Sequence, residues 1–426
     1  MMRLLLLSTL YQNVLTAGNL NGPELKAAFE RVANQMRDKY DMSLAAAFYS
    51  PKLNFTVASG YTDAGLGMGK KTRAAQVDDL YVWGSTTKMF TAPAVLQLVE
   101  QGKVALEDPI AVHIDPILLA LNGTRLHEKF GDPIHDVQIQ HLLHMTSGIQ
   151  DYDGEAFSTA QFANRSKAFG PVEIISRFVS PTLSSKPGQQ QMYCSTNYIL
   201  LGLVLATHYH QPDSSWSWQA YDQTSVIPTA LEKVFNHSKF VKSGPCNNFT
   251  PVHGFMEFYP SASLPQQDVW DVSCLGGWTA GNYLGSVADV ARFTYELYNT
   301  RKPTIVSAAS QAMLTNFSTM AGGFFKFYGM GTFNLAWSIG GGKDAYGHVG
   351  DTYGYQSQTT YVPEDDFVIT VATNVETTKQ AQPADFTCLA YHALKAVMQG
   401  TSPAHCAMVI PQRFIGKCVC MPELIV

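Results

Sequence analysis

A serine and a lysine stand three positions apart at the start of an apolar run, in the stretch YVWGSTTKMFTA at residues 81–92. Residues three apart on a helix share a face, so Ser85 and Lys88 would lie side by side, with about 5–6 Å between their β-carbons. A neutral lysine amine there can take the proton of the serine hydroxyl and make the oxygen a nucleophile. The alternative is an N-capping serine beside a solvated lysine, and the pair alone does not decide between the two.

Two later stretches also have patterns that suit an active site. The stretch QMYCSTNYILLG at residues 191–202 places Tyr193 and Ser195 directly before a buried apolar run, where the alternative is a simple capping turn. The stretch GHVGDTYGY at residues 347–355 is rich in glycine and precedes a strand-like segment. Glycines in a strand let its backbone approach a ligand closely, and the alternative is a turn that enters an edge strand.

The three stretches resemble, in order and approximate spacing, the motifs of the serine β-lactamase and penicillin-binding protein superfamily. That superfamily carries Ser-x-x-Lys, then Tyr-x-Asn or Ser-x-Asn, then Lys-Thr-Gly or His-x-Gly. The phrases LEDPI (106–110) and HLLHMTSGI (141–149) and the segment at 280–293 are similar to connecting pieces of its class C branch. The resemblance extends from about residue 24 to residue 400.

The resemblance implies a serine hydrolase that forms an acyl-enzyme and uses neither a cofactor nor a metal. Ser85 would attack a carbonyl carbon, Lys88 and Tyr193 would share its proton, and Tyr193 would protonate the leaving group. The oxyanion would lie between the backbone amides of Ser85 and Asp351.

The second and third motifs depart from the family's pattern where a substrate would bind. His348 replaces the motif's lysine, ahead of Gly350, and would supply a donor or, when protonated, a positive charge. Ser195 stands where asparagine is usual, and Val349 where a threonine hydroxyl would meet a substrate carboxylate. Asp351 adds a negative charge, and like charges placed together cost several kcal/mol. We therefore expect poor β-lactamase activity and an ester, a lactone or a small peptide as the substrate.

The elements that must position these residues follow from hydrophobic spacing. Helices are predicted over residues 23–40, 86–101, 287–298 and 384–398. Ser286 and Asp289 form the pattern of a capping box before the third of these helices. Strand-like segments on either side of the turns at residues 51–52 and 363–366 predict two hairpins.

Strand patterns therefore lie near both ends of the chain and helical patterns fill its middle. This order predicts an α/β (α+β) fold, in which an antiparallel sheet formed from both chain ends is flanked by helices and carries a mostly helical insertion. The predicted units are a signal peptide at 1–18, a sheet domain at 19–110 and 290–400, a mainly helical domain at 111–289 and a cysteine-containing tail at 401–426.

Composition and charge limit the classes of molecule that the protein can be expected to bind. Only 15% of the 426 residues are charged, and 29 basic against 34 acidic residues give a net charge of -5. Without a basic block we expect no nucleic acid, so the expected partner is a small-molecule or peptide substrate. Residues 1–18 combine an arginine, a short leucine-rich run and small residues, as secretory leaders do. No other run reaches the roughly 18 apolar residues of a membrane span.

Sequons and cysteines also point to a secreted protein. Six Asn-x-Ser/Thr sequons occur, at Asn54, Asn122, Asn164, Asn236, Asn248 and Asn316, and together with the leader they predict a secreted glycoprotein. Seven cysteines allow at most three disulfides, and the last four are placed to staple the C-terminal tail. Cys194 is interpreted as a buried filler, with a redox-sensitive thiol as the alternative.

The histidines were considered as metal ligands. His141 and His144 share a helix face, and His208 and His210 are separated by one residue. Neither pair has an obvious third ligand, so the sequence predicts no catalytic metal.

Two other functions remain open at this stage. A protein of this fold can act as a non-catalytic receptor or scaffold, and the substrate can instead be a D-aminoacyl peptide or a β-lactam. The presence of Ser85, Lys88 and Tyr193 together favours an enzyme.

Overall fold

The computed structural model describes residues 21–209, 217–235, 237–257, 266–317, 328–377 and 381–406. The predicted signal peptide, the sequon at Asn236, and Cys418 and Cys420 of the tail lie outside these ranges. Within them, no helix combines the length and the apolar character that crossing a membrane requires.

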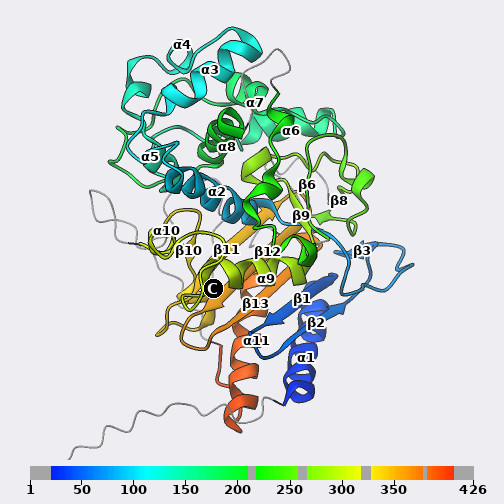
Figure 1. Ribbon diagram of the computed structural model, residues 1–426. Coiled ribbons are helices and arrows are strands. Elements are labelled where there is room, and N and C mark those ends of the chain that lie inside the picture. Colours follow the sequence, from blue (N-terminus) through cyan, green and yellow to red (C-terminus); the bar gives the residue numbers. More distant parts are fainter. Residues whose placement is uncertain are drawn as a thin grey trace, which may run out of the picture.

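The main sheet is built from the two ends of the chain (Figure 1). Among the described residues it has six antiparallel strands in the order β10-β11-β12-β13-β1-β2. Their bounds are β1 Leu44–Tyr49, β2 Asn54–Ser59, β10 Phe333–Asn334, β11 Tyr346–Thr352, β12 Tyr355–Val362 and β13 Phe367–Thr373. Leu44 of β1 lies opposite Thr373 of β13, so the N-terminal hairpin joins the C-terminal one directly. The predicted fold class and both predicted hairpins are confirmed.

Helices cover both faces of this sheet. The two terminal helices, α1 (Gly22–Tyr40) and α11 (Gln382–Gln399), pack against each other and against one face. The other face is covered by α9 (Val287–Tyr298), which contacts β1, β12 and β13. These helices form because apolar residues recur at helical spacing, and α1 buries Leu25, Phe29 and Met36 in this way.

The predicted capping box at the start of α9 is only half formed. The Ser286 hydroxyl accepts the backbone N–H of Asp289 at 3.2 Å, as an N-cap should. The Asp289 carboxylate interacts with the Ser286 hydroxyl rather than with the Ser286 backbone N–H. It accepts the Ser238 hydroxyl at 2.8 Å and the backbone N–H of His237 at 3.1 Å, because tertiary partners compete with the local one.

The middle of the chain is mostly helical and lies beside the sheet (Figure 1). The helices of this region are α2 Lys88–Glu100, α3 Ile110–Asn122, α4 Leu126–Phe130, α5 Ile139–Leu143, α6 Glu155–Ala163, α7 Pro171–Phe178 and α8 Ser195–Tyr209. A further helix, α10 Ala308–Leu314, follows α9. The short strands are β3 Ala64–Gly65, β4 Met68–Gly69, β5 Tyr81–Val82, β6 Lys239–Phe240, β7 Phe255–Met256, β8 Gln267–Asp268, β9 Tyr283–Gly285 and β14 Val375–Glu376. They form the small sheets β3-β4, β5-β9-β6 and β14-β7-β8. Sequence patterning missed them because strands of two or three residues carry no readable alternation. The predicted domain boundaries stay a prediction.

Two disulfides tie loops to this framework. One joins Cys246 to Cys274 in the middle region, and the other joins Cys388 of α11 to Cys406, which staples the start of the C-terminal tail as predicted. Cys194 is buried and carries no disulfide, which agrees with its interpretation as a filler. The asparagines of the five described sequons, Asn54, Asn122, Asn164, Asn248 and Asn316, are exposed.

Candidate active site

Ser85 lies on a short 3-10 turn, Gly84–Thr87, that leads into α2. Lys88 is the first residue of α2, and its side chain is fully buried. The Lys88 Nζ atom lies 2.9 Å from the Ser85 Oγ atom. The structure therefore brings the predicted pair together, although the 3-10 turn moves the helix start from the predicted residue 86 to Lys88.

Lys88 has two further partners that hold its amine in place. Its Nζ lies 3.0 Å from the Ala280 carbonyl oxygen and 3.2 Å from the Ser195 Oγ. A charged amine can donate to all three oxygens. A neutral amine can donate to two of them and accept the proton of Ser85, because a hydroxyl is both a donor and an acceptor. The network thus accommodates both protonation states of the lysine without a rearrangement.

Tyr193 is the third predicted catalytic residue and lies beside this amine. The Lys88 Nζ is 4.9 Å from the centroid of the Tyr193 ring, within the range of a cation–π contact. The ring stacks on Phe333 of β10 at 5.7 Å and meets Tyr328 edge to face at 5.7 Å. Residues from both halves of the chain therefore fix the position of the phenol.

His348 of β11 points to the same aromatic group. Its ring centroid is 4.7 Å from that of Phe333, and its Nε2 is 3.1 Å from the hydroxyl oxygen of Tyr328. Burial, and then the charge of Lys88, hold the pKa of this histidine well below its usual value of 6.5. The imidazole is therefore neutral at neutral pH. This corrects one of its two predicted roles, because burial beside a lysine opposes a positive charge there.

The predicted oxyanion site depends on a close approach of two backbone segments, β11 and the turn that carries Ser85. Thr352 of β11 pairs with Tyr355 of β12, and these two residues close a two-residue loop. Asp351 comes one position before Thr352 and lies opposite Gln356. Since backbone groups in an antiparallel ladder point alternately toward and away from the partner strand, the Asp351 amide points away from β12. A β-carbon on Gly84 would lie 2.9 Å from the Asp351 nitrogen. The amide therefore faces the nucleophile turn.

Glycines make this approach feasible. Gly84 has a φ of +50°, a conformation that glycine adopts at little cost. A β-carbon on Gly350 would lie 1.9 Å from the Trp83 carbonyl oxygen, which is a severe clash. The sequence suggested that the glycines of this stretch clear space for a ligand. In the structure, Gly350 instead clears space for the turn that carries Ser85.

Ser85, Ser195 and Asp351 line one pocket, and sequence reasoning missed the other acidic residues around it. Asp153 and Glu376 also line the pocket, while Asp151 lies just outside it and accepts the backbone N–H of Ser195 at 2.9 Å. Asp151 thereby holds the start of α8, which carries Ser195. Burial raises the pKa of the Asp151 carboxyl, and the Ser195 N–H bond and the charge of Lys88 oppose that shift. Single acidic residues far apart in sequence carry no local signal of such a cluster.

The histidine pairs considered as metal ligands have structural partners. The His141 Nδ1 accepts the backbone N–H of Gln138 at the start of α5. The His208 Nε2 lies 3.0 Å from the His113 Nδ1, and the His113 Nε2 lies 2.9 Å from Asp108. His210 lies outside the described residues.

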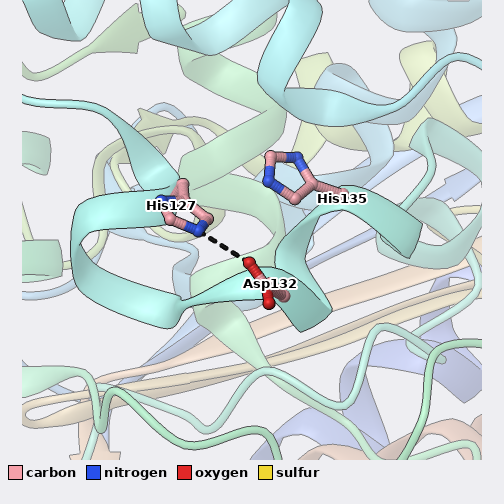
Figure 2. A group of neighbouring side chains, drawn as sticks. All are labelled: His127, Asp132 and His135. Carbon is pink, nitrogen blue, oxygen red and sulfur yellow. Dashed lines mark hydrogen bonds and ion pairs between the residues drawn. The ribbon is translucent and has the colours of Figure 1, made fainter.

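A group that the sequence did not single out has ligand atoms close enough to hold a metal ion. The nitrogen and oxygen atoms of His127, Asp132 and His135 all lie within 4.8 Å of one another (Figure 2). This group was not among those considered from the sequence. The histidine pairs considered there are at most three positions apart, whereas His127 and His135 are eight apart and meet because Gly131 ends α4 and lets the next turn fold back.

Comparison with known proteins identifies the family to which the chain belongs. The family model described as Beta-lactamase matches residues 44–393. The protein flp of Staphylococcus aureus (strain NCTC 8325 / PS 47) is 29% identical over 217 residues, which cover 50% of this chain and 37% of flp. Penicillin-binding protein 4* of Bacillus subtilis (strain 168) is 24% identical over 261 residues, 59% of this chain and 53% of that protein. The match thus spans about half or less of each relative.

Solved structures share the fold. A D-stereospecific amidohydrolase from Streptomyces sp. superimposes with a TM-score of 0.65 at 17% identity, covering 88% of this chain and 99% of its own. The D-amino acid amidase from Ochrobactrum anthropi SV3 superimposes with a TM-score of 0.66 at 18% identity and the same coverage. At these identities the likeness concerns the fold alone.

Proposed function

This chain belongs to the β-lactamase family of serine hydrolases, and we propose that it hydrolyses a small acyl compound through an acyl-enzyme formed on Ser85. The observation that carries the proposal is the 2.9 Å contact between the Lys88 amine and the Ser85 hydroxyl, inside a site that buries the amine completely. Because the buried amine contacts the hydroxyl directly, it is placed to exchange a proton with the Ser85 oxygen.

The proposed reaction has two halves. In the first, the Ser85 Oγ attacks the substrate carbonyl carbon while neutral Lys88 takes the hydroxyl proton, and the oxyanion is held by the amides of Ser85 and Asp351. The bond to the leaving group then breaks as Tyr193 gives its phenolic proton to the departing oxygen or nitrogen, and Lys88 passes the proton taken from Ser85 to the phenolate. In the second half, water attacks the acyl-enzyme along the same path and releases the acid and free Ser85.

The proposed substrates are an ester, a lactone or a small peptide. The acidic residues of the pocket support the expectation that β-lactams and other carboxylate-bearing substrates react poorly. Among the alternatives, amides and peptides of D-amino acids gain support, because two structures with the same fold carry the names D-amino acid amidase and D-stereospecific amidohydrolase.

A secretory location is also part of the proposal. Exposed asparagines at five sequons and two disulfides suit a protein that passes through an oxidising secretory compartment. Expression of the full chain in eukaryotic cells, followed by glycosidase treatment of the medium, tests this. Protein in the medium whose mobility shifts supports the proposal, and protein that stays inside the cells without a shift contradicts it.

A fluorophosphonate probe tests the hydrolase itself. We expect the wild-type chain to be labelled covalently at Ser85 and Ser85→Ala to lose the label. Ser402→Ala is the matched control, because Ser402 is an exposed serine outside the pocket and outside every sequon, and it should label as the wild type does. A folded wild-type protein that never labels would instead favour the non-catalytic receptor or scaffold.

A further inference from the structure

Three acidic residues line the pocket that holds Ser85, and they come from three separate segments. Asp153 lies on the loop before α6, Asp351 on β11 and Glu376 on β14. Among the described residues that line this pocket there is no lysine or arginine. The Lys88 amine lies nearby, but it is not among the residues lining the pocket and is hydrogen-bonded to oxygens of Ser85, Ser195 and Ala280. The surface that a substrate meets is therefore acidic.

The carboxyl groups are close enough to disturb one another. Glu376 is only 4% exposed and accepts the backbone N–H of Gly354 at 2.9 Å. Burial, and then the neighbouring charges of Asp351 and Asp153, raise the pKa of the Glu376 carboxyl well above its usual value. Asp351 in turn receives a hydrogen bond of 3.0 Å from the Gln356 side chain. A cation among these groups would relieve their repulsion.

Aromatic side chains form much of the remaining wall. Tyr152, Phe157 and Tyr353 line the same pocket, and the rings of Tyr152 and Phe157 meet edge to face at 4.8 Å. Aromatic rings combined with carboxylates are a common environment for an organic ammonium group, because both attract positive charge while the rings also exclude water. Among the described residues, these three carboxyl groups do not bring oxygen atoms within 4.8 Å of one another, as a shared metal ion would require.

We propose that this pocket binds a free amino group next to the scissile carbonyl, so that the substrate is an aminoacyl amide or ester with a protonated α-amine. The inference rests on the proposed function, since the pocket is that of the nucleophile. The α-ammonium and the carbonyl carbon of an amino acid are two bonds apart, so one small pocket receives both. Asp153, Asp351 and Glu376 are then specificity-determining residues.

Matched substrates test the proposal on the full chain. Both enantiomers of alanine p-nitroanilide are compared with their N-acetyl counterparts, which lack only the positive charge and gain an acetyl group. We expect kcat/KM to be at least about tenfold higher for one free-amine enantiomer than for its acetylated form. Asp351→Asn and Glu376→Gln should each reduce that ratio toward one. Asp344→Asn removes an equal charge from an exposed position before β11 and should leave the ratio as it is.

Labelling of Ser85 separates the two proposals. If the probe labels Ser85 but the ratio is one or below, the ammonium proposal is overturned and the hydrolase stands. If Ser85 labels and neither anilide is hydrolysed, a competition experiment decides. Alanine methyl ester and N-acetylalanine methyl ester are each tested for how well they protect Ser85 from the probe, and equal protection overturns the ammonium proposal. If Ser85 does not label, the proposed function fails and the inference fails with it.

A second inference concerns the group formed by His127, Asp132 and His135, which lies outside the pocket. The His127 Nε2 is 2.9 Å from the Asp132 Oδ1, and the two imidazole rings stack with centroids 5.0 Å apart. Figure 2 shows His127 and Asp132 pointing toward each other with the His135 ring beside them. All three are exposed on a segment of nine residues, at the outer end of the helical region in Figure 1.

The geometry points to a binding site for a divalent transition metal such as Zn²⁺. Two imidazoles and one carboxylate form a ligand set that zinc accepts, with water completing the tetrahedron. Because the ligands lie on a short continuous segment, small side-chain movements are enough to bring them around an ion. The site is separate from the catalytic pocket, and a bound ion there would act on α4 and the turn Asp132–Asp136.

Titration of the full chain with ZnCl₂ against a fluorescent zinc indicator tests this site. We expect about one ion per chain, with His127→Ala and His135→Ala each weakening binding about tenfold or more. His405→Ala removes an exposed histidine elsewhere and should bind zinc as the wild type does. Absence of binding, or equal binding by the wild type and both cluster variants, overturns the proposal.

Discussion

Replacement of Gly350 by alanine tests whether the contact between β11 and the nucleophile turn builds the active site. The new β-carbon would lie 1.9 Å from the Trp83 carbonyl oxygen, against 3.4 Å for an ordinary contact, so the two backbones must separate by about 1.5 Å. Overpacking of this kind costs about 1–3 kcal/mol of folding stability. A displacement of about 1 Å at reacting groups costs about 100-fold in rate. Activity should therefore fall much further than stability.

The assay is the rate of fluorophosphonate labelling at Ser85, measured alongside the urea midpoint of unfolding. Phosphonylation uses the same oxyanion amides as the proposed reaction, so it reports their position without knowledge of the substrate. We expect Gly350→Ala to remain folded at 25 °C and to label about 100-fold more slowly. Gly154→Ala is the matched control, because its β-carbon would meet no atom within 4 Å.

Two results would refute this reasoning. A Gly350→Ala protein that labels at the wild-type rate would mean that the approach of β11 to the turn does not position the oxyanion amide. Equal slowing by Gly154→Ala would mean that any added methyl near the pocket has the same effect.

Three further predictions use other parts of the structure. Ser195→Ala removes one of the partners of the Lys88 amine and should slow Ser85 labelling about tenfold, whereas an unchanged rate would show that this hydrogen bond has no role. Burial lowers the pKa of His144 from 6.5 to about 4, so its stabilising effect is complete above pH 6.5 and is lost as the pH falls toward 4. Between pH 7.5 and pH 5 the wild type should therefore lose about 2 kcal/mol more unfolding free energy than His144→Gln, as measured by urea titration. Replacing Cys246 and Cys274 together by serine should lower the unfolding free energy by about 2–4 kcal/mol, and a variant as stable as the wild type would contradict a formed disulfide.

Local patterns predicted the parts of the site that depend on local geometry. Ser85 and Lys88 meet because three positions along a helical turn bring side chains to one face, whatever the rest of the chain does. The two hairpins were predictable because each consists of two short strand-like segments on either side of a turn signal, although β1 and β13 are buried along almost their whole length and do not alternate. The C-terminal staple from Cys388 to Cys406 followed from cysteine spacing, although its pairing did not.

The rest of the site depends on contacts that no local pattern encodes. Asp151 and Glu376 are single acidic residues, and only the folded chain brings them near Ser85. The purpose of Gly350 was misread for a related reason, since its crowding neighbour is Trp83, far away in sequence. The neutral state of His348 likewise depends on burial by residues from several segments.

The pairing of β1 with β13 has a consequence for synthesis of the protein. A ribosome that has made residues up to about 340 has already produced the nucleophile, its base and the tyrosine, yet the strand that completes their surroundings does not exist. The first hairpin must wait with one edge open until more than 300 further residues have emerged, and an open edge is a place where other chains can add. Premature termination therefore releases an aggregation-prone fragment rather than a weakened enzyme. Chaperones that bind the nascent chain should matter more for this protein than for one whose sheet is contiguous in sequence.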